Sequence, residues 1–110
     1  MSVLDKIRKA REQRVEVGGF TFTVRRPTDI EMIALQGTGT VARLLPFVIG
    51  WNGVKEIDII HGGDPHPVTF DREICDEWLS DRPDLLGPLV EKIMDLYRLH
   101  VDALGETAKN

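Results

Sequence analysis

The sequence has little of several features that would define a class of protein. It contains one cysteine in 110 residues, so no disulfide can form within the chain and we expect a reducing compartment. Its first twenty residues include no apolar segment of the kind that directs secretion. No run approaches the roughly 18 apolar residues that cross a bilayer. We therefore expect a cytoplasmic protein with no membrane partner.

No combination of residues typical of a catalytic or cofactor site is found either. Gly18-Gly19 and Gly62-Gly63 lie outside the strand–loop–helix context in which glycines bind phosphate groups. Asp76 and Glu77 are adjacent on an expected helix, so they point to different faces and cannot share a proton. We expect no enzyme activity, no cofactor and no small-molecule substrate.

Metal and nucleic-acid binding are also disfavoured. The residue types that ligate metals gather only at His61, Asp64, His66 and Cys75, in no spacing typical of zinc. We interpret the loop around the histidines as a polar turn, and Cys75 as a packed residue beside Trp78. A pI near 5.3 and the lack of a recognised nucleic-acid motif argue against DNA or RNA as a partner.

The charge is distributed unevenly along the chain. The length and composition are otherwise typical of one globular domain over residues 1–110. Residues 1–26 carry seven lysines and arginines against three acids, and residues 27–110 carry seven against fifteen, within a net charge of −4. This polarity predicts attraction between copies of the chain or toward a charged partner, although a solvated helix face would have the same pattern.

The first quarter of the chain predicts a basic helix and then a β-hairpin. Residues 1–13 form an amphipathic segment whose thin apolar face includes Leu4 and Ile7, so this helix should fray unless it docks on a surface. Residues 14–27 alternate apolar and polar around two glycines, which is typical of a tight hairpin turn. The expected core side of the hairpin comprises Val15, Val17, Phe20, Phe22 and Val24.

Residues 28–104 predict a helical body that begins with two helices. Thr28 and Glu31 have the spacing of a capping box at the start of the first helix. The next helix should run from Thr40 to about Gly50, with a kink or a restart at Pro46. It is the expected central buried helix because its second half has almost no polar face. The expected apolar face of the first helix comprises Ile30, Ile33 and Ala34.

Two further helices complete the expected body. Asp71 caps the third, with Ile74, Cys75, Trp78 and Leu79 toward the core, and apolar residues from Leu86 to Leu104 define the fourth. Gly105 is the expected stop, which leaves residues 105–110 as a polar tail. Residues 54–60 fit either a strand or a helical turn. The predicted fold class is α+β, mainly α: an N-terminal β-hairpin followed by about four helices in one small domain.

A small set of apolar residues is the expected partner-binding surface. Phe47, Trp51 and Trp78 are large aromatic residues in the middle of the chain, and such side chains dominate both cores and interfaces. For the two tryptophans, we expect a role as anchors in the core ahead of contact with a partner. Together with Leu4 and Ile7, the three aromatic residues are those expected to hold an apolar helix in a groove between helices.

Three segments carry a resemblance to a known family. They are RRPTDIEM (residues 25–32), LLPFVIGW (residues 44–51) and VTFD (residues 68–71), the last preceding Trp78-Leu79. Over roughly residues 20–110 the chain resembles the tail assembly chaperones of long-tailed bacteriophages and prophages. The resemblance implies a non-enzymatic protein that binds the aggregation-prone tape measure protein in the host cytoplasm, supports assembly of the tail tube and is absent from the mature virion.

The resemblance also implies further partners. These are the tail tube protein and a longer form made by −1 frameshifting near Lys109-Asn110. Other copies of the same chain are a partner expected from the charge distribution and the thin N-terminal helix. The codons for Ala108-Lys109-Asn110 can form a slippery heptamer, although an ordinary polar tail has the same residues. The alternative is a small structural accessory protein of the phage, such as a head–tail joining or tail completion factor.

Overall fold

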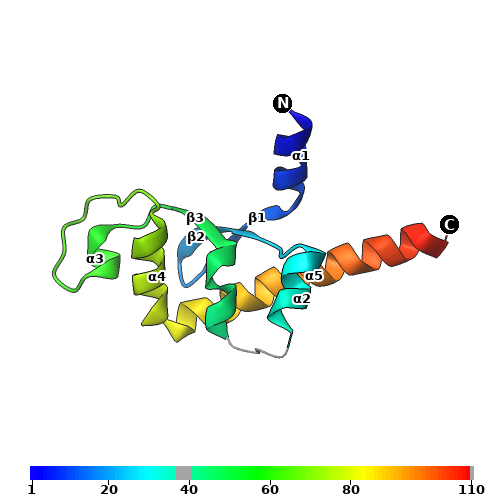
Figure 1. Cartoon of the computed structure of the whole chain (residues 1–110). Helices are drawn as coiled ribbons and strands as arrows, with labels where there is room; N and C mark the ends of the chain where they lie inside the picture. The colour runs from blue at the N-terminus through cyan, green and yellow to red at the C-terminus, as the bar shows by residue number, and fades with distance from the viewer. Residues whose placement is uncertain (37–40, 110) are drawn as a thin grey trace.

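The computed structural model of the protein describes residues 1–36 and 41–109 (Figure 1). A three-stranded antiparallel sheet of order β1-β2-β3 packs with several helices, so the predicted α+β class, mainly α, is confirmed. The elements are α1 (Val3–Ala10), β1 (Glu12–Val17), β2 (Phe20–Arg25), α2 (Asp29–Leu35), the 3-10 helix η1 (Val41–Phe47), β3 (Val48–Asn52), α3 (Glu56–Ile59), α4 (Arg72–Ser80) and α5 (Pro83–Lys109). The predicted helix start at Thr40 and the end of the chain at Asn110 lie outside the described residues.

Helix α1 is shorter than the helix predicted over residues 1–13. The hydroxyl of Ser2 accepts a hydrogen bond from the backbone N–H of Asp5 at 3.0 Å and caps the first turn. The helix ends at Ala10, and Glu12 and Gln13 already belong to β1. The extension of the helix through Gln13 is wrong because pairing with β2 satisfies the backbone groups there.

The β-hairpin is confirmed, with residues 12–17 antiparallel to residues 20–25. Gly18 and Gly19 form the two-residue turn with φ of 60° and 84°, a conformation that residues with a Cβ rarely adopt. Four of the five residues predicted for the core side are buried, and Phe20 is partly buried against the same cluster. The alternation in the sequence therefore identified the buried face of the hairpin correctly.

The predicted central helix over residues 40–50 is wrong. Val41–Phe47 forms a short 3-10 helix that contains Pro46, and the chain then enters β3. In β3, Trp51 lies opposite Phe22 and Val48 opposite Val24, with a register irregularity between these pairs. Proline ends regular α-helix, and the residues after it, FVIGW, are mostly aromatic and β-branched types that fit a strand. An apolar run of this length does not distinguish a buried strand from a buried helix.

Helix α2 has the predicted start but not the predicted apolar contact. Thr28 and Glu31 form a complete capping box. Ile30 and Ile33 are 76% and 63% exposed, and Ala34 is also exposed, so the expected apolar face points away from the core. The helix is held instead by Leu35 at its end, which packs against the core, and by its acidic residues, which bond to β2 and α5 as described below.

Residues 54–60, for which the sequence left two alternatives, contain the single helical turn α3. Before it, Lys55 forms an isolated bridge with Pro67. The backbone N–H of Glu56 donates to the carbonyl of His66 at 3.0 Å, and that of Ile57 donates to Asp64 at 2.9 Å. These bonds close the glycine- and proline-rich segment predicted as a loop into a compact loop around α3.

Helices α4 and α5 depart from the prediction in detail. Asp71 caps α4 through the N–H groups of Glu73 and Ile74, but Ile74 itself is 37% exposed rather than in the core. Helix α5 begins at Pro83 and continues through Gly105 to Lys109. The predicted stop at Gly105 and the polar tail are wrong, because one glycine in a helix costs only about 1 kcal/mol.

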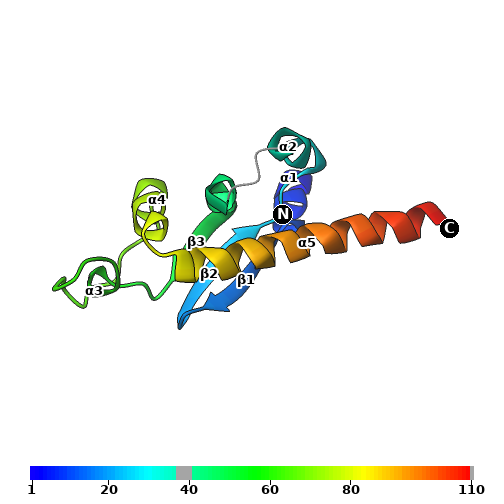
Figure 2. The same ribbon diagram turned by 90° about the horizontal axis from the view of Figure 1, so that it is seen from below.

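Helix α5 organises the core. It crosses β1 and β2 and also packs against α4 and η1 (Figure 2). Its first half provides Leu85, Leu86, Leu89 and Ile93 to the core, and its second half projects beyond the body. No helix within the described residues is long and apolar enough to span a membrane. The other buried members of the apolar core cluster are Val15, Val17, Phe22, Val24, Leu45, Phe47, Val48, Val54, Cys75, Trp78 and Leu79.

Candidate partner-binding surfaces

The three aromatic residues predicted to contact a partner lie in or beside the core. Phe47 and Trp78 are each 5% exposed. Trp51 is partly buried, and its indole N–H donates to the carbonyl of Val68 at 2.7 Å. The Trp51 ring meets Phe70 and Trp78 edge to face, at centroid distances of 4.9 and 5.7 Å. These contacts join β3, α4 and the loop before α4, so a partner would reach only the exposed edge of Trp51.

Leu4 and Ile7 are different because they lie on the surface. They are 53% and 44% exposed, and Val3 beside them is 72% exposed. No residue of α1 is buried, and the helix stands away from the body above β1 (Figure 1). Of the residues predicted to bind a partner, these two are therefore directly available in this conformation.

Sequence reasoning missed a second exposed apolar surface, on α2 and the projecting half of α5. Ile30 and Ile33 on α2 were assigned to the core, and Val101 and Leu104 on α5 were counted as part of a core-facing stripe. Val101 and Leu104 are 45% and 51% exposed. The spacing of apolar residues does continue through Leu104, but spacing alone cannot show where the rest of the body ends.

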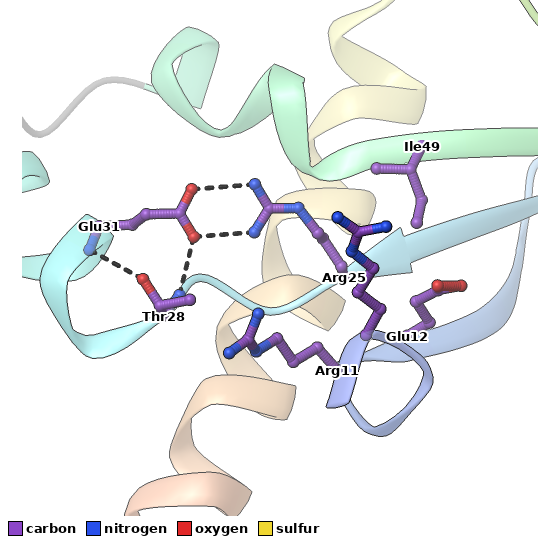
Figure 3. Close-up of a pocket in the computed structure, with 7 residues that line it drawn as sticks. Arg11, Glu12, Arg25, Thr28, Glu31 and Ile49 are labelled. Carbon is purple, nitrogen blue, oxygen red and sulfur yellow. Dashed lines mark hydrogen bonds and ion pairs between the residues drawn. The ribbon is translucent and has the colours of Figure 1, made fainter. Parts of the chain in front are cut away.

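An open hollow of about 420 Å³ lies between the end of α1, the edge of the sheet and the start of α2 (Figure 3). Three arginines line it, namely Arg8, Arg11 and Arg25, together with Glu12, Thr28, Glu31 and Ile49. Arg25 is fixed, whereas Arg8 and Arg11 have no ion-pair partner among the residues that the structure describes. The hollow therefore presents guanidinium groups that can bind a carboxylate or a phosphate group.

Glu31 is the centre of the bonds within this hollow. The guanidinium of Arg25 donates to both of its carboxylate oxygens, at 2.8 and 2.9 Å. The backbone N–H of Thr28 donates to the same carboxylate at 2.9 Å, and the Thr28 hydroxyl accepts from the Glu31 N–H at 3.1 Å. Arg25 also lies over the Phe47 ring, 4.4 Å from its centroid. This set of contacts fixes α2 against the end of β2.

The bonds to Glu31 change its acidity. The hydrogen bonds from Arg25 are the largest cause that lowers the pKa of Glu31, from 4.5 to about 2. Burial is the next-largest effect and raises the pKa, while the hydrogen bond from the Thr28 N–H lowers it further. The folded-state pKa lies below the unfolded-state value. The stabilising contribution is therefore complete above about pH 4.5 and disappears as the pH falls through about 2.

We expect Glu31→Gln to lower the free energy of unfolding by about 0.5–1 kcal/mol near neutral pH, because the pair with Arg25 is partly open to solvent. The difference from the wild type should shrink toward zero as the pH approaches 2. Urea unfolding at several pH values measures both effects. Glu12→Gln, in the same hollow, is the control and should leave the stability near neutral pH unchanged, because Glu12 forms no ion pair among the described residues. If the difference in stability between Glu31→Gln and the wild type were the same at all pH values, the lowered pKa of Glu31 would be contradicted.

A second polar cluster joins α2 to α5. The hydroxyl of Tyr97 donates to a carboxylate oxygen of Asp29 at 3.0 Å, and Nε2 of His100 lies 3.3 Å from the same oxygen. The hydrogen bond from Tyr97 is the main cause that lowers the pKa of Asp29, and the same bond raises the pKa of Tyr97. These contacts tie the first turn of α2 to the projecting half of α5.

The residues weighed as metal ligands are dispersed between two elements. His61 and His66 lie in the loop around α3, whereas Cys75 is fully buried in α4. Burial raises the pKa of the Cys75 thiol to about 11, so the thiol remains protonated at neutral pH. Among the described residues, no three histidine, cysteine or acidic side chains are grouped in a way that could hold a metal ion.

Comparison with known proteins identifies no relative. A scan against protein-family models finds no matching model, and searches of curated proteins and of solved structures find no match.

Proposed function

We propose that this chain is a non-enzymatic tail assembly chaperone, which binds the tape measure protein of a long-tailed phage or prophage while the tail tube assembles. The proposal places it in the host cytoplasm and outside the mature virion. Its partners are the tape measure protein, the tail tube protein, further copies of the chain and a longer frameshifted form. The resemblance of residues 20–110 to the family supports this function.

The observation that carries the proposal is the amount of apolar surface that the fold leaves exposed. Among the described residues, large apolar side chains more than about a third exposed occur on α1, α2, η1, α3, α4 and α5, while the aromatic residues are used to build the core. Exposed apolar side chains that share one helix face, as Val3, Leu4 and Ile7 do on α1, are typical of a surface that binds other chains. An aggregation-prone tape measure protein with long apolar helices is a client that such surface suits.

The test is co-expression of the chain with the tape measure protein encoded in the same genome. We expect the tape measure protein to remain soluble and to co-purify with the chain. The matched control is the same tape measure fragment with the apolar residues of its expected helices replaced by serine, which should no longer co-purify. A tape measure protein that stays insoluble would overturn the proposal, and so would the recovery of the chain in mature particles, which favours a tail completion or head–tail joining factor.

A further inference from the structure

Helix α1 cannot be stable as an isolated element. It has eight residues, and helices shorter than about 12–15 residues are marginal in water unless they pack against something. Its apolar residues Val3, Leu4 and Ile7 are all exposed. Figure 1 shows α1 apart from α2 and from the projecting half of α5 of its own chain. The apolar face of α1 is thus a surface that requires a partner.

A surface of similar character lies at the corner where α2 meets α5. We define this corner patch as Ile30, Ile33, Val101 and Leu104, which are 76%, 63%, 45% and 51% exposed. The contacts of Asp29 with Tyr97 and His100 hold its two sides together. On α5, Leu104 follows Leu86 by 18 residues, or five full turns. The core-facing stripe of α5 therefore runs past the body into the corner patch.

The charges of the two surfaces are opposite. The segment from Val3 to Arg11 carries four basic side chains against one acid, and among the described residues Arg8 and Arg11 have no ionic partner. Helix α2 and residues 95–106 of α5 carry five acids, of which Glu31 pairs with Arg25 and Asp95 with Arg98. Asp29, Asp102 and Glu106 form no ion pair with a lysine or arginine among the described residues. Opposite charges steer two surfaces together and disfavour contacts between two copies of the same surface.

We propose that α1 of one copy docks in the corner patch of a second copy. Its apolar face covers Ile30, Ile33, Val101 and Leu104, and its basic residues approach the acidic residues around them. The two surfaces differ, so either two copies dock their α1 helices on each other reciprocally, or each copy accepts one neighbour while it docks on another. This contact between copies does not depend on a tape measure protein. It can therefore be absent while the chain still binds the tape measure protein, and it can form while that binding is absent.

The first experiment measures the mass of the purified full chain in solution by light scattering. We expect the wild type to exceed the mass of a monomer and to dissociate on dilution and at high salt, because the charge contribution is screened. Leu4→Ser with Ile7→Ser and, separately, Ile30→Ser with Leu104→Ser should each raise the apparent dissociation constant about tenfold or more. Ile57→Ser with Ile60→Ser, equally exposed on and beside α3, is the control and should assemble as the wild type does.

The second experiment distinguishes this contact from pairing of two α1 helices. The α1 variant retains an intact corner patch, and the corner variant retains an intact α1. We expect the two variants to be monomeric alone and to form a 1:1 complex when mixed. Circular dichroism and thermal unfolding show that both variants are folded. A monomeric wild type, a corner variant that still assembles, or the absence of a complex on mixing would overturn the proposal.

Discussion

Gly18→Ala is expected to lower the free energy of unfolding by about 2–4 kcal/mol, from backbone strain and overpacking together. Gly18 has φ of 60°, and a Cβ there would overlap with Cδ2 of Leu85. Leu85 is 1% exposed, so it cannot move aside without displacing other core residues. Urea unfolding of the variant measures the loss of stability. It thereby tests whether the hairpin turn packs against Leu85 of α5.

The adjacent glycine is the matched control. Gly19 has φ of 84°, but a Cβ at this position would meet no atom within 4 Å. Gly19→Ala should therefore show backbone strain alone, about 1–2 kcal/mol. Combining Gly18→Ala with Leu85→Ala should give less than the sum of the two separate losses, since the second change relieves the contact made by the first. Two results together would contradict the close approach of Gly18 to Leu85. The two glycine variants would lose the same stability, and the losses from Gly18→Ala and Leu85→Ala would simply add.

The sequence predicts those parts of the fold that depend on neighbouring residues. The hairpin turn requires two glycines in sequence, the capping box requires Thr28 and Glu31 three apart, and the α4 cap requires Asp71 immediately before the helix. These signals are local, and all three appear in the structure. The error at β3 has the opposite origin. Whether LLPFVIGW becomes helix or strand depends on the free edge of β2, which lies more than twenty residues away in the chain.

The exposed surfaces, too, could be identified from the sequence only where the signal is local. Leu4 and Ile7 could be identified because α1 is amphipathic with few apolar residues, so its face has no obvious place in the core. Ile30 and Ile33 could not, because two isoleucines on a capped helix have the pattern of an ordinary core-facing helix. Their exposure follows from the polar bonds that orient α2, of Glu31 with Arg25 six residues earlier and of Asp29 with Tyr97, which is 68 residues away in the chain.

Leu86→Ala is expected to lower the free energy of unfolding by about 2–5 kcal/mol, because it removes most of a side chain that is 6% exposed in the core. Leu104→Ala changes the same residue type on the same face of the same helix. Since Leu104 is 51% exposed, we expect its substitution to alter stability by no more than about 0.5 kcal/mol. Both variants should be measured by urea unfolding at a concentration where the chain is monomeric, because association would add to the apparent stability.

The comparison tests whether α5 has two functions along one continuous stripe. If its first half builds the core and its second half provides a binding surface, Leu86→Ala should weaken folding with little direct effect on association. Leu104→Ala should do the reverse, with weaker association of copies in light scattering and an unchanged unfolding midpoint. A loss of several kcal/mol for Leu104→Ala in the monomer would contradict this division, because it would mean that the second half of α5 packs against its own body. With the division intact, one amphipathic pattern extends the core of one copy into the contact with the next.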